Sequence, residues 1–432
     1  MTDIHLTLNN FLDSEILLGL FPVSDEYECT AKRVFRLKAH RRCAQGHIMV
    51  HNGYDYARKG GLGKVRIGKQ RCMICREEYH EDKGFWKGLL SRWKDAITKM
   101  ILVLRDLHVS WQGISHVMDF IMPMGKDKAI SFFDEAIGEF TYEQKNYVIV
   151  NYDEQHPKNG RIQKFRLTLL NYVTKQPIAD ELFDSKDDET IEMFLRKNLD
   201  TERKIVIITD CDRRYPAIFK KIWGKNVIHQ KCLLHLNKLI VNDFGKKLTL
   251  LEEYNKYLLL NIFYNREKEL LFLQKMLKKQ EQKSFANAKE KEEWLKEAKQ
   301  KFYEYLRTME NTRRRNKKNL TQRKLFKAEK IINDLLQQQM LLSTNARKRL
   351  IMIKKNWESF TAFYHIKDCP ATNNAIENFY STSLKTHRKK QLRSDKGIIN
   401  HMKLAAIKRS TNMFKPKETI LQIYSAIRAV VT

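Results

Sequence analysis

The stretches YVIVNYDEQ (147–155) and KIVIITD (204–210) decide the fold of the middle of the chain. Both are short, rich in β-branched residues and bounded by polar residues, which is typical of buried strands. The other expected elements of this region are the strands KFRLTLLNYV (164–173), QPIADELF (176–183) and KNVIHQ (225–230) and the helices DDETIEMFLRKNL (187–199) and PAIFKKIW (216–223). The resulting order, β-β-β-α-β-α-β, predicts an α/β domain.

Each of the two deciding strands ends in an aspartate, Asp153 in the first and Asp210 in the fourth strand of that order. If the fourth strand lies beside the first, the two carboxylates are neighbours, and neighbouring carboxylates repel unless a divalent cation lies between them. Two cations held in this way are what two-metal phosphoryl transfer needs. A third ligand is required, and Glu377, on an expected helix that carries basic residues on its next turns, is the candidate.

Two further acids lie next to these positions. Asp212 is two residues beyond Asp210, but the turn over 213–216 is expected to put it in a loop, so it ranks second. Glu154 is expected to face the opposite side of the strand from Asp153. The alternative for each acid alone is structural, because an aspartate at a strand end usually serves a turn or a helix cap. The order of the three acids, on a strongly basic chain, favours the catalytic interpretation.

A group of cysteine and histidine residues near the N-terminus has the spacing of a metal site. Its members form a C-x3-H pair and a C-x2-C pair that are separated by 24 residues, and they are Cys43, His47, Cys72 and Cys75. Two such pairs on tight turns can surround one tetrahedral zinc ion, and four protein ligands leave no open position for catalysis. We therefore predict a structural Zn2+ site in a zinc-ribbon-like module. His80 competes with His47 as the fourth ligand, Cys29 is a weaker candidate, and two unrelated turns are the alternative.

The charge of the chain points to a polyanionic partner. Of 432 residues, 81 are Lys or Arg and 51 are Asp or Glu, which gives a net charge of +30. Nucleic acid is the first candidate for the partner, and a merely lysine-rich or ribosome-associated protein is the alternative. No apolar run is long enough to span a membrane, and the first residues lack the pattern of a signal peptide. Seven scattered cysteines argue against a disulfide scaffold.

Three segments are candidates for contact with DNA. HVSWQGISHVMDFIM (108–122) resembles the second half of a helix-turn-helix, with Gln112, Ser115 and His116 expected on the exposed face, although an ordinary helical hairpin is the alternative. A long stretch after residue 236 is expected to be helical, and it carries the basic run Arg313, Arg314 and Arg315, which suits phosphate contacts or, alternatively, a solvated helix face. A second basic strip follows Glu377 and consists of His387, Arg388, Lys389, Lys390 and Arg393.

The segments around the acids resemble those of a known family. ITDCDRRYP surrounds Asp210, HQKCLLHLNK follows it with the C-x2-H pair Cys232 and His235, and NNAIENFYSTSLKTHRKKQLRS surrounds Glu377. Together they are similar to the DDE transposases of prokaryotic insertion sequences, which have an RNase H-like catalytic core. Several groups of that family carry a C-x2-H pair after the second Asp and a helical insertion before the Glu. Here the second and third acids are 167 residues apart, and the resemblance spans about residues 40–410.

The resemblance implies a DNA transposase of the prokaryotic cytoplasm that binds the ends of its own element. Asp153, Asp210 and Glu377 would hold two Mg2+ or Mn2+ ions for strand cleavage and strand transfer. Its partners would be double-stranded DNA, as inverted-repeat ends and as target, and further copies of the chain in a dimer or larger assembly. Cys232 and His235 would order the active site, or else be a small buried cysteine with a hydrogen-bonded histidine. The rivals are an RNase H-like nuclease without strand transfer and a zinc-containing DNA-binding regulator.

The expected fold is therefore an α/β RNase H-like core that is interrupted by an all-α insertion. A small zinc-ribbon-like module and a helix-turn-helix-like segment precede the core. The expected divisions are a helical arm at 1–40, the zinc-ribbon-like module at 41–85, the DNA-binding helices at 86–140, the first part of the core at 141–238, the helical insertion at 239–368, and the end of the core with a C-terminal helix at 369–432.

Overall fold

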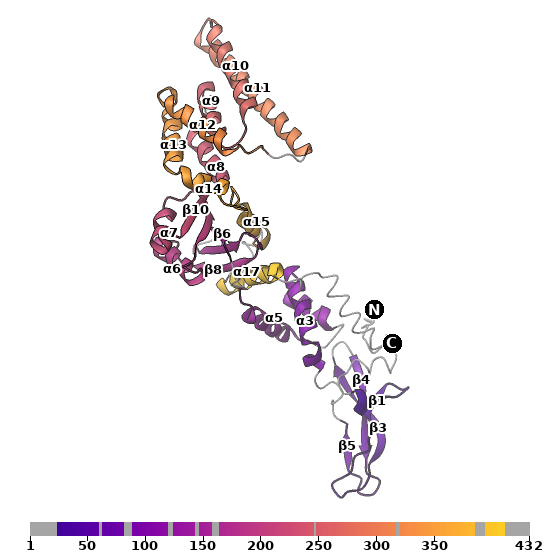
Figure 1. Ribbon diagram of the computed structural model, residues 1–432. Helices are drawn as coiled ribbons and strands as arrows, with labels where there is room; N and C mark the ends of the chain where they lie inside the picture. The colour runs from indigo at the N-terminus through magenta and orange to yellow at the C-terminus, as the bar shows by residue number, and fades with distance from the viewer. Residues whose placement is uncertain are drawn as a thin grey trace. The chain divides into compact units, whose positions relative to one another are not determined.

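The computed structural model shows a mixed α/β chain with two separate sheets (Figure 1). It describes residues 24–59, 63–81, 89–119, 124–142, 147–157, 164–245, 248–316, 320–384 and 394–410. The chain divides into two compact units, one formed by Met1–Thr141 with Arg393–Thr432 and the other by Tyr142–Leu392. Within the described residues, no helix is both long and apolar enough to cross a membrane.

The sheet of the second unit has the strand order β10-β9-β6-β7-β8. Its strands are β6 (Ile149–Gln155), β7 (Phe165–Asn171), β8 (Pro177–Phe183), β9 (Ile205–Thr209) and β10 (Val227–Lys231). The first three form an antiparallel meander, whereas β9 runs parallel to β6 and β10 runs parallel to β9. Parallel neighbours need a crossover, and α6 (Asp188–Asn198) and α7 (Tyr215–Trp223) supply the two crossovers. The predicted order β-β-β-α-β-α-β is confirmed.

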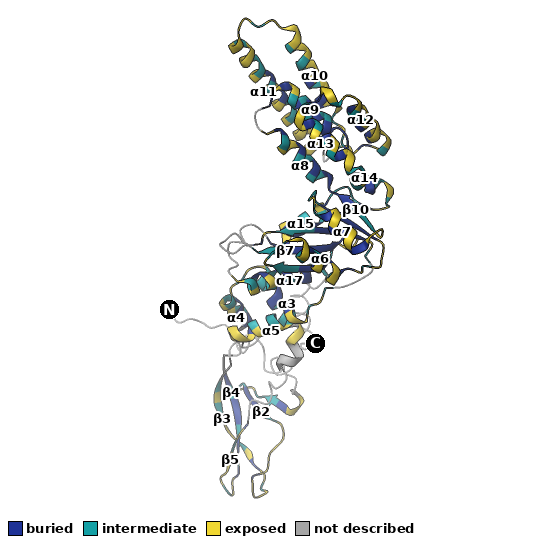
Figure 2. Cartoon of the chain, turned by 90° about the vertical axis from the view of Figure 1, so that its left-hand side faces the viewer, coloured by how far each residue is buried: buried dark blue, intermediate teal, exposed yellow. Residues whose placement is uncertain are grey.

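Helices cover both faces of this sheet. Successive side chains of each strand point to opposite faces, and both faces are apolar. One set, which includes Tyr152, Leu167 and Ile207, packs with α6 and α7. On the opposite face, Ile149 and Ile208 lie in a cluster with apolar residues of α14 (Trp357–His365) and the loop that follows it. Leu170 on that face packs with α15 (Asn374–Ser383). The sheet is therefore the middle layer between two layers of helices (Figure 2).

The described residues between β10 and α15 are predominantly helical, as predicted. The helices that precede α14 are α8 (Leu233–Phe244), α9 (Leu250–Leu260), α10 (Glu267–Gln282), α11 (Ala288–Arg315), α12 (Leu325–Gln337) and α13 (Thr344–Lys355). They share one apolar core that runs from α8 to α14. A local signal marks the start of α9: the Thr249 hydroxyl accepts a bond from the Glu252 amide, and the Glu252 carboxylate accepts one from the Thr249 amide, which forms a capping box.

The first unit contains the second sheet, whose order is β1-β2-β4-β3 with β5 on β4. The strands are β1 (Tyr27–Cys29), β2 (Val34–Leu37), β3 (Val50–Lys59), β4 (Gly63–Arg71) and β5 (Glu78–His80). The expectation of a helical arm over 1–40 is wrong for the described part, because β1 and β2 join this sheet and Phe35 is fully buried in it. Residues 1–23 lie outside the described residues.

The first unit also contains a small helical core. It is built from α3 (Leu89–Asp106), α4 (Trp111–Asp119), α5 (Lys126–Glu139) and α17 (Asp395–Ser410). Leu404 and Ile407 of α17 pack in one cluster with apolar residues of α3, α4 and α5, such as Ile101 and Phe133. This differs from the expected division, which grouped all of 369–432 with the catalytic core. The helix expected near the C-terminus lies outside the described residues.

Candidate functional site

The strand register places Asp153 beside Asp210. In the parallel pair of β6 and β9, the last paired residues are Asn151 and Ile208. Two residues further along each strand are Asp153 and Asp210, so their backbones are neighbours at the same end of the sheet. Ile149 and Ile208 point to the face covered by α14 and α15, and side chains alternate, so both aspartates belong to that face. The prediction that the fourth strand lies beside the first is confirmed.

Glu377 lies in the first turn of α15, the helix that covers this face. Its Oε1 atom is 3.3 Å from Lys238 Nζ and 3.6 Å from His235 Nε2, and both of these residues belong to α8. The carboxylate is therefore shared between two nitrogen groups of one neighbouring helix. This contact joins two of the segments that the sequence singled out, those that carry His235 and Glu377.

The electrostatics show that these acids act on one another. Burial raises the pKa of Asp153 to about 8, the hydrogen bond from the Glu154 amide opposes this, and the charges of Asp210 and Glu377 add to it. Burial also raises the pKa of Asp210, while the Asp212 amide and His235 oppose the rise. Among the described residues, however, the three acids do not form a group whose oxygens all lie within 4.8 Å. The acids are near enough to repel but are less compact than the cysteine group below.

The two rival acids have other partners. Asp212 follows β9 in a loop, as expected, and its Oδ2 lies 2.9 Å from Arg214 Nη2. Partial burial raises the pKa of Asp212, but the hydrogen bonds from Arg214 outweigh it and the pKa is lowered. Glu154 accepts hydrogen bonds from the hydroxyls of Tyr152 and Tyr215, at 3.1 and 3.0 Å, on the α6 and α7 side of the sheet. Glu154 therefore faces away from Asp153, as the alternation predicts.

The C-x2-H pair lies at the junction of these elements. Cys232 is fully buried, and its amide donates to the Thr209 carbonyl at the end of β9, at 2.9 Å. Its Sγ accepts the Asn373 amide at 3.2 Å, directly before α15. His235 is one turn further along, with its Nδ1 buried and without a hydrogen-bond partner. Cys232 therefore connects the end of β9 to the residue directly before α15.

Sequence reasoning missed four residues of this site. Asn151 and Asn373 are both buried and are bonded to each other, from Asn151 Nδ2 to Asn373 Oδ1, at 2.6 Å. Tyr380 donates its hydroxyl to the Asp153 carbonyl at 2.7 Å, and Lys238 contacts Glu377. The only signal for Asn151 was one polar residue inside an apolar strand, which marks a buried hydrogen-bonding group.

The cysteine group is compact and its four ligands come from two tight turns. The ligand atoms of Cys43, His47, Cys72 and Cys75 all lie within 4.8 Å of one another. In the first turn, the Gly46 amide bonds to the Cys43 carbonyl at 2.9 Å, and Gly46 has φ +84°, which favours glycine. In the second turn, the Cys75 amide donates to Cys72 Sγ at 3.3 Å. The set of three sulfurs and one imidazole could hold a zinc ion.

The structure also decides between the proposed fourth ligands. His80 forms an ion pair with Asp55 and is not part of the group, whereas His47 Nδ1 faces Cys43 Sγ at 3.5 Å. Among the described residues, Cys29 is not part of the group either. The Cys75 amide, above all, lowers the pKa of the Cys72 thiol to about 6. A thiol that ionises this readily is prepared for metal binding, because the thiolate is the ligand.

The predicted DNA-contact residues have different environments. Gln112 and His116 are exposed on α4 and lie 3.1 Å apart, from Nε2 to Nε2. The expectation that Ser115 is exposed is wrong, because its side chain is buried and its hydroxyl donates to the Met124 carbonyl at 2.7 Å. That bond connects α4 to the segment directly before α5. The basic strip at His387, Arg388, Lys389, Lys390 and Arg393 lies outside the described residues.

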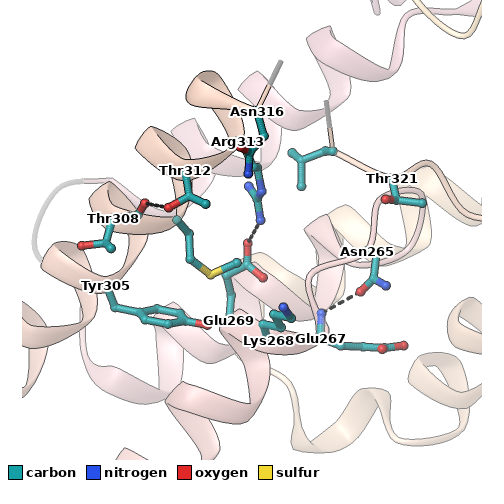
Figure 3. A pocket seen from close by; sticks show the side chains of 12 residues that line it. Asn265, Glu267, Lys268, Glu269, Tyr305, Thr308, Thr312, Arg313, Asn316 and Thr321 are labelled. Carbon is teal, nitrogen blue, oxygen red and sulfur yellow. Dashed lines mark hydrogen bonds and ion pairs between the residues drawn. The ribbon is translucent and has the colours of Figure 1, made fainter. Parts of the chain in front are cut away.

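The basic run on α11 ends beside a pocket of about 590 Å³ between α10 and α11 (Figure 3). Arg313 lines this pocket, and its Nη2 lies 2.9 Å from Oε1 of Glu269, a residue that is only 1% exposed. Arg314 pairs with Glu310 on its own helix, and Arg315 is exposed. The charge of Arg313 is therefore committed to a buried carboxylate, whereas Arg315 is available to solvent.

No model of a protein family matches the chain, and a search of the curated proteins found no match.

Proposed function

We propose that the chain is a DNA transposase of the DDE type with an RNase H-like core. The observation that carries the proposal is the pairing of β6 with β9, which makes Asp153 and Asp210 neighbours on the face covered by the helix of Glu377. A fold has no structural need for three carboxylates that repel one another at a sheet edge. Such an arrangement is typical of sites that bind divalent cations.

The residues fit magnesium or manganese. Both ions prefer oxygen ligands, and three carboxylates supply them. The raised pKa of Asp153 reports a place where negative charge is poorly compensated, and a cation would relieve this. Lys238 neutralises part of the charge of Glu377, whereas burial lowers the pKa of His235 and favours its neutral form, so the site keeps a net need for positive charge near Asp153 and Asp210.

The chemistry of the ions, when bound, would be to activate an attacking oxygen and stabilise a leaving oxygen of a phosphodiester. The residues of the chain would position the ions and the DNA strand. Asp153 and Asp210 are fixed by the sheet, and Glu377 is fixed by α15 packed over it. Lys238, which is exposed beside Glu377, is placed to contact a phosphate oxygen of the DNA strand.

The other parts of the chain support a DNA substrate. The net charge of +30 favours binding of the chain to the phosphate backbone of double-stranded DNA. Such binding does not depend on the base sequence. The exposed Gln112 and His116 on α4 would contact bases, and the cysteine group would stabilise the zinc-ribbon-like module by holding Zn2+. Joining two element ends requires at least two copies of the chain, so we propose a dimer or larger assembly in a prokaryotic cytoplasm.

The test is cleavage and joining of labelled DNA that carries the inverted repeats flanking the gene. With Mg2+ or Mn2+, the purified chain should cleave at the repeat end and join the freed 3′ end to a target. Cleavage without joining would leave the RNase H-like nuclease as the function. Sequence-specific binding without cleavage by a chain with intact acids would leave the zinc-containing regulator.

A further inference from the structure

Two side chains bond to consecutive carbonyls of β6, one from Asn373 directly before α15 and one from Tyr380 on α15, and Glu377 lies between them in sequence. The Asn373 amide donates to the Tyr152 carbonyl at 3.0 Å. The Tyr380 hydroxyl donates to the Asp153 carbonyl at 2.7 Å. Asn373 precedes Glu377 by four residues and Tyr380 follows it by three, so all three side chains lie on one side of the helix.

The bond made by Asn373 is not an ordinary helix cap. Asparagine at the position before a helix usually accepts a bond from an amide of the first turn, but Asn373 makes no such bond. Its side chain turns to the sheet instead, where it also accepts from Asn151 Nδ2 at 2.6 Å. Its own amide donates to Cys232 Sγ at 3.2 Å. The residue is fully buried, so the loss of these partners would leave polar groups unpaired.

We infer that Asn373 and Tyr380 are positioning residues that set Glu377 at a fixed distance from Asp153 and thereby set the affinity of the acid site for a divalent cation. This inference rests on the proposed function. The charge of Glu377 raises the pKa of Asp153, so the two carboxylates repel each other when both are ionised. The two bonds to β6 hold the two acids together against this repulsion. They attach the helix turn that carries Glu377 to the backbone of Tyr152 and of Asp153 itself.

Asn373 also connects distant parts of the chain, because it bonds directly to Asn151 on β6 and to Cys232 at the start of α8. Glu377 is therefore attached to the sheet through Asn373 and Tyr380, in addition to its own contacts with His235 and Lys238 of α8. Mutation of a residue that bonds to a metal ligand, but not to the metal itself, commonly lowers metal affinity by about 10- to 100-fold.

The test measures Mn2+ binding to the full-length, zinc-loaded chain without DNA, by titration with electron paramagnetic resonance. The variants are Tyr380→Phe and Asn373→Ser. Tyr380→Phe keeps the ring that packs against the Arg166 guanidinium, 4.9 Å from the ring centroid, so it should fold. The matched control is Tyr215→Phe, which also removes a buried tyrosine hydroxyl bonded to β6, but on the opposite face and without contact to α15.

Tyr380→Phe should weaken Mn2+ binding by about tenfold and Asn373→Ser by at least as much, whereas Tyr215→Phe should bind as the unaltered chain does. High Mn2+ should restore cleavage by Tyr380→Phe. Unchanged affinity in both α15 variants, or equal weakening in Tyr215→Phe, would overturn the inference while leaving the proposed function intact. The proposed function fails, and the inference with it, if the unaltered chain binds no Mn2+ or if Asp153→Asn binds Mn2+ as the unaltered chain does.

Discussion

The cysteine group and the acid group are built in opposite ways. The four residues of the cysteine group lie between positions 43 and 75, on two turns that form by local hydrogen bonds. The three acids lie between positions 153 and 377 and meet only because β9 pairs with β6 and α15 packs over them. The ligand atoms of the first group lie within 4.8 Å, and those of the second do not. A site made by local turns is complete on its own, whereas a site made by topology depends on everything that positions its elements.

The largest effect is expected from the acids. Asp153→Asn should lower DNA cleavage by about 10³-fold or more, because a metal-binding charge worth several kcal/mol to the transition state is lost. DNA binding should stay equal or become tighter, since repulsion of phosphate is relieved. Cleavage of a labelled element end, run beside a gel-shift assay, measures both.

The same assay compares the neighbouring aspartates. Asp210→Asn should be inactive and Asp212→Asn should keep at least partial activity, because Asp212 is paired with Arg214 in the loop. The reverse result would assign the second ligand to Asp212. Full activity in Glu377→Gln would remove α15 from the site.

The cysteine group should respond as a closed, local site. Cys72→Ser should lose about one zinc per chain, unfold the module around β3 and β4, and weaken binding to the element end. Zinc content by atomic absorption and binding by gel shift test this. His80→Ala is the control, because His80 pairs with Asp55 outside the group, and it should keep its zinc. Zinc retained in Cys72→Ser, or lost in His80→Ala, would break the contrast drawn between the two sites.

The acid group and the cysteine group should give stability pH dependences of opposite sign, because the pKa of Asp153 is raised and that of Cys72 is lowered. Because the folded pKa of Asp153 is raised to about 8, the folded chain holds a proton that the unfolded chain has released. Stability should therefore fall as pH rises from about 4 to about 8, by at most about 1.4 kcal/mol per pH unit. Thermal melts across this range measure the slope, and added Mg2+ should raise the melting temperature more at pH 8 than at pH 5. An equally steep slope in Asp153→Asn would assign the effect to another group.

The smallest effects are expected on α11. Arg313→Ala should destabilise the helical insertion by about 1–3 kcal/mol, because buried Glu269 loses one of its two arginine partners and keeps Arg266. Arg314→Ala should cost less than about 0.5 kcal/mol, since its pair is exposed. Arg315→Ala should reduce by about one the slope of the logarithm of the DNA-binding constant against the logarithm of salt concentration, without changing stability. Denaturant melts and binding at several salt concentrations separate the three, and equal stability losses would contradict this ranking.

The local features of the molecule could be predicted from the sequence. The strands around Asp153 and Asp210 follow from runs of β-branched residues, and the cysteine group follows from its spacing. Long-range features were harder. Nothing in the pattern around Tyr27–Leu37 shows that these residues join a sheet, because β2 pairs with a strand some 30 positions later.

The candidate site shows the same limit. The burial of Ser115 depends on a carbonyl in the next segment of the chain, at Met124, and helical periodicity cannot report that. The role of Asn373 depends on partners at Asn151 and Cys232, which are 222 and 141 positions away. Residue type and spacing suggested the ligands, whereas the groups that position those ligands could be identified only from the fold.

The return of α17 to the N-terminal helices has a consequence for biosynthesis. Glu139, at the end of α5, and Asp395, at the start of α17, are 256 positions apart. On a ribosome, which makes chains from the N-terminus, the cluster around Ile101 and Phe133 must wait for Leu404 and Ile407 to emerge, while the intervening unit folds first. A nascent chain that stops early would thus contain all three acids but not the finished helical core that is proposed to hold DNA. Premature termination would separate the proposed catalytic site from the proposed DNA-binding helices, and only a product that includes α17 would combine them.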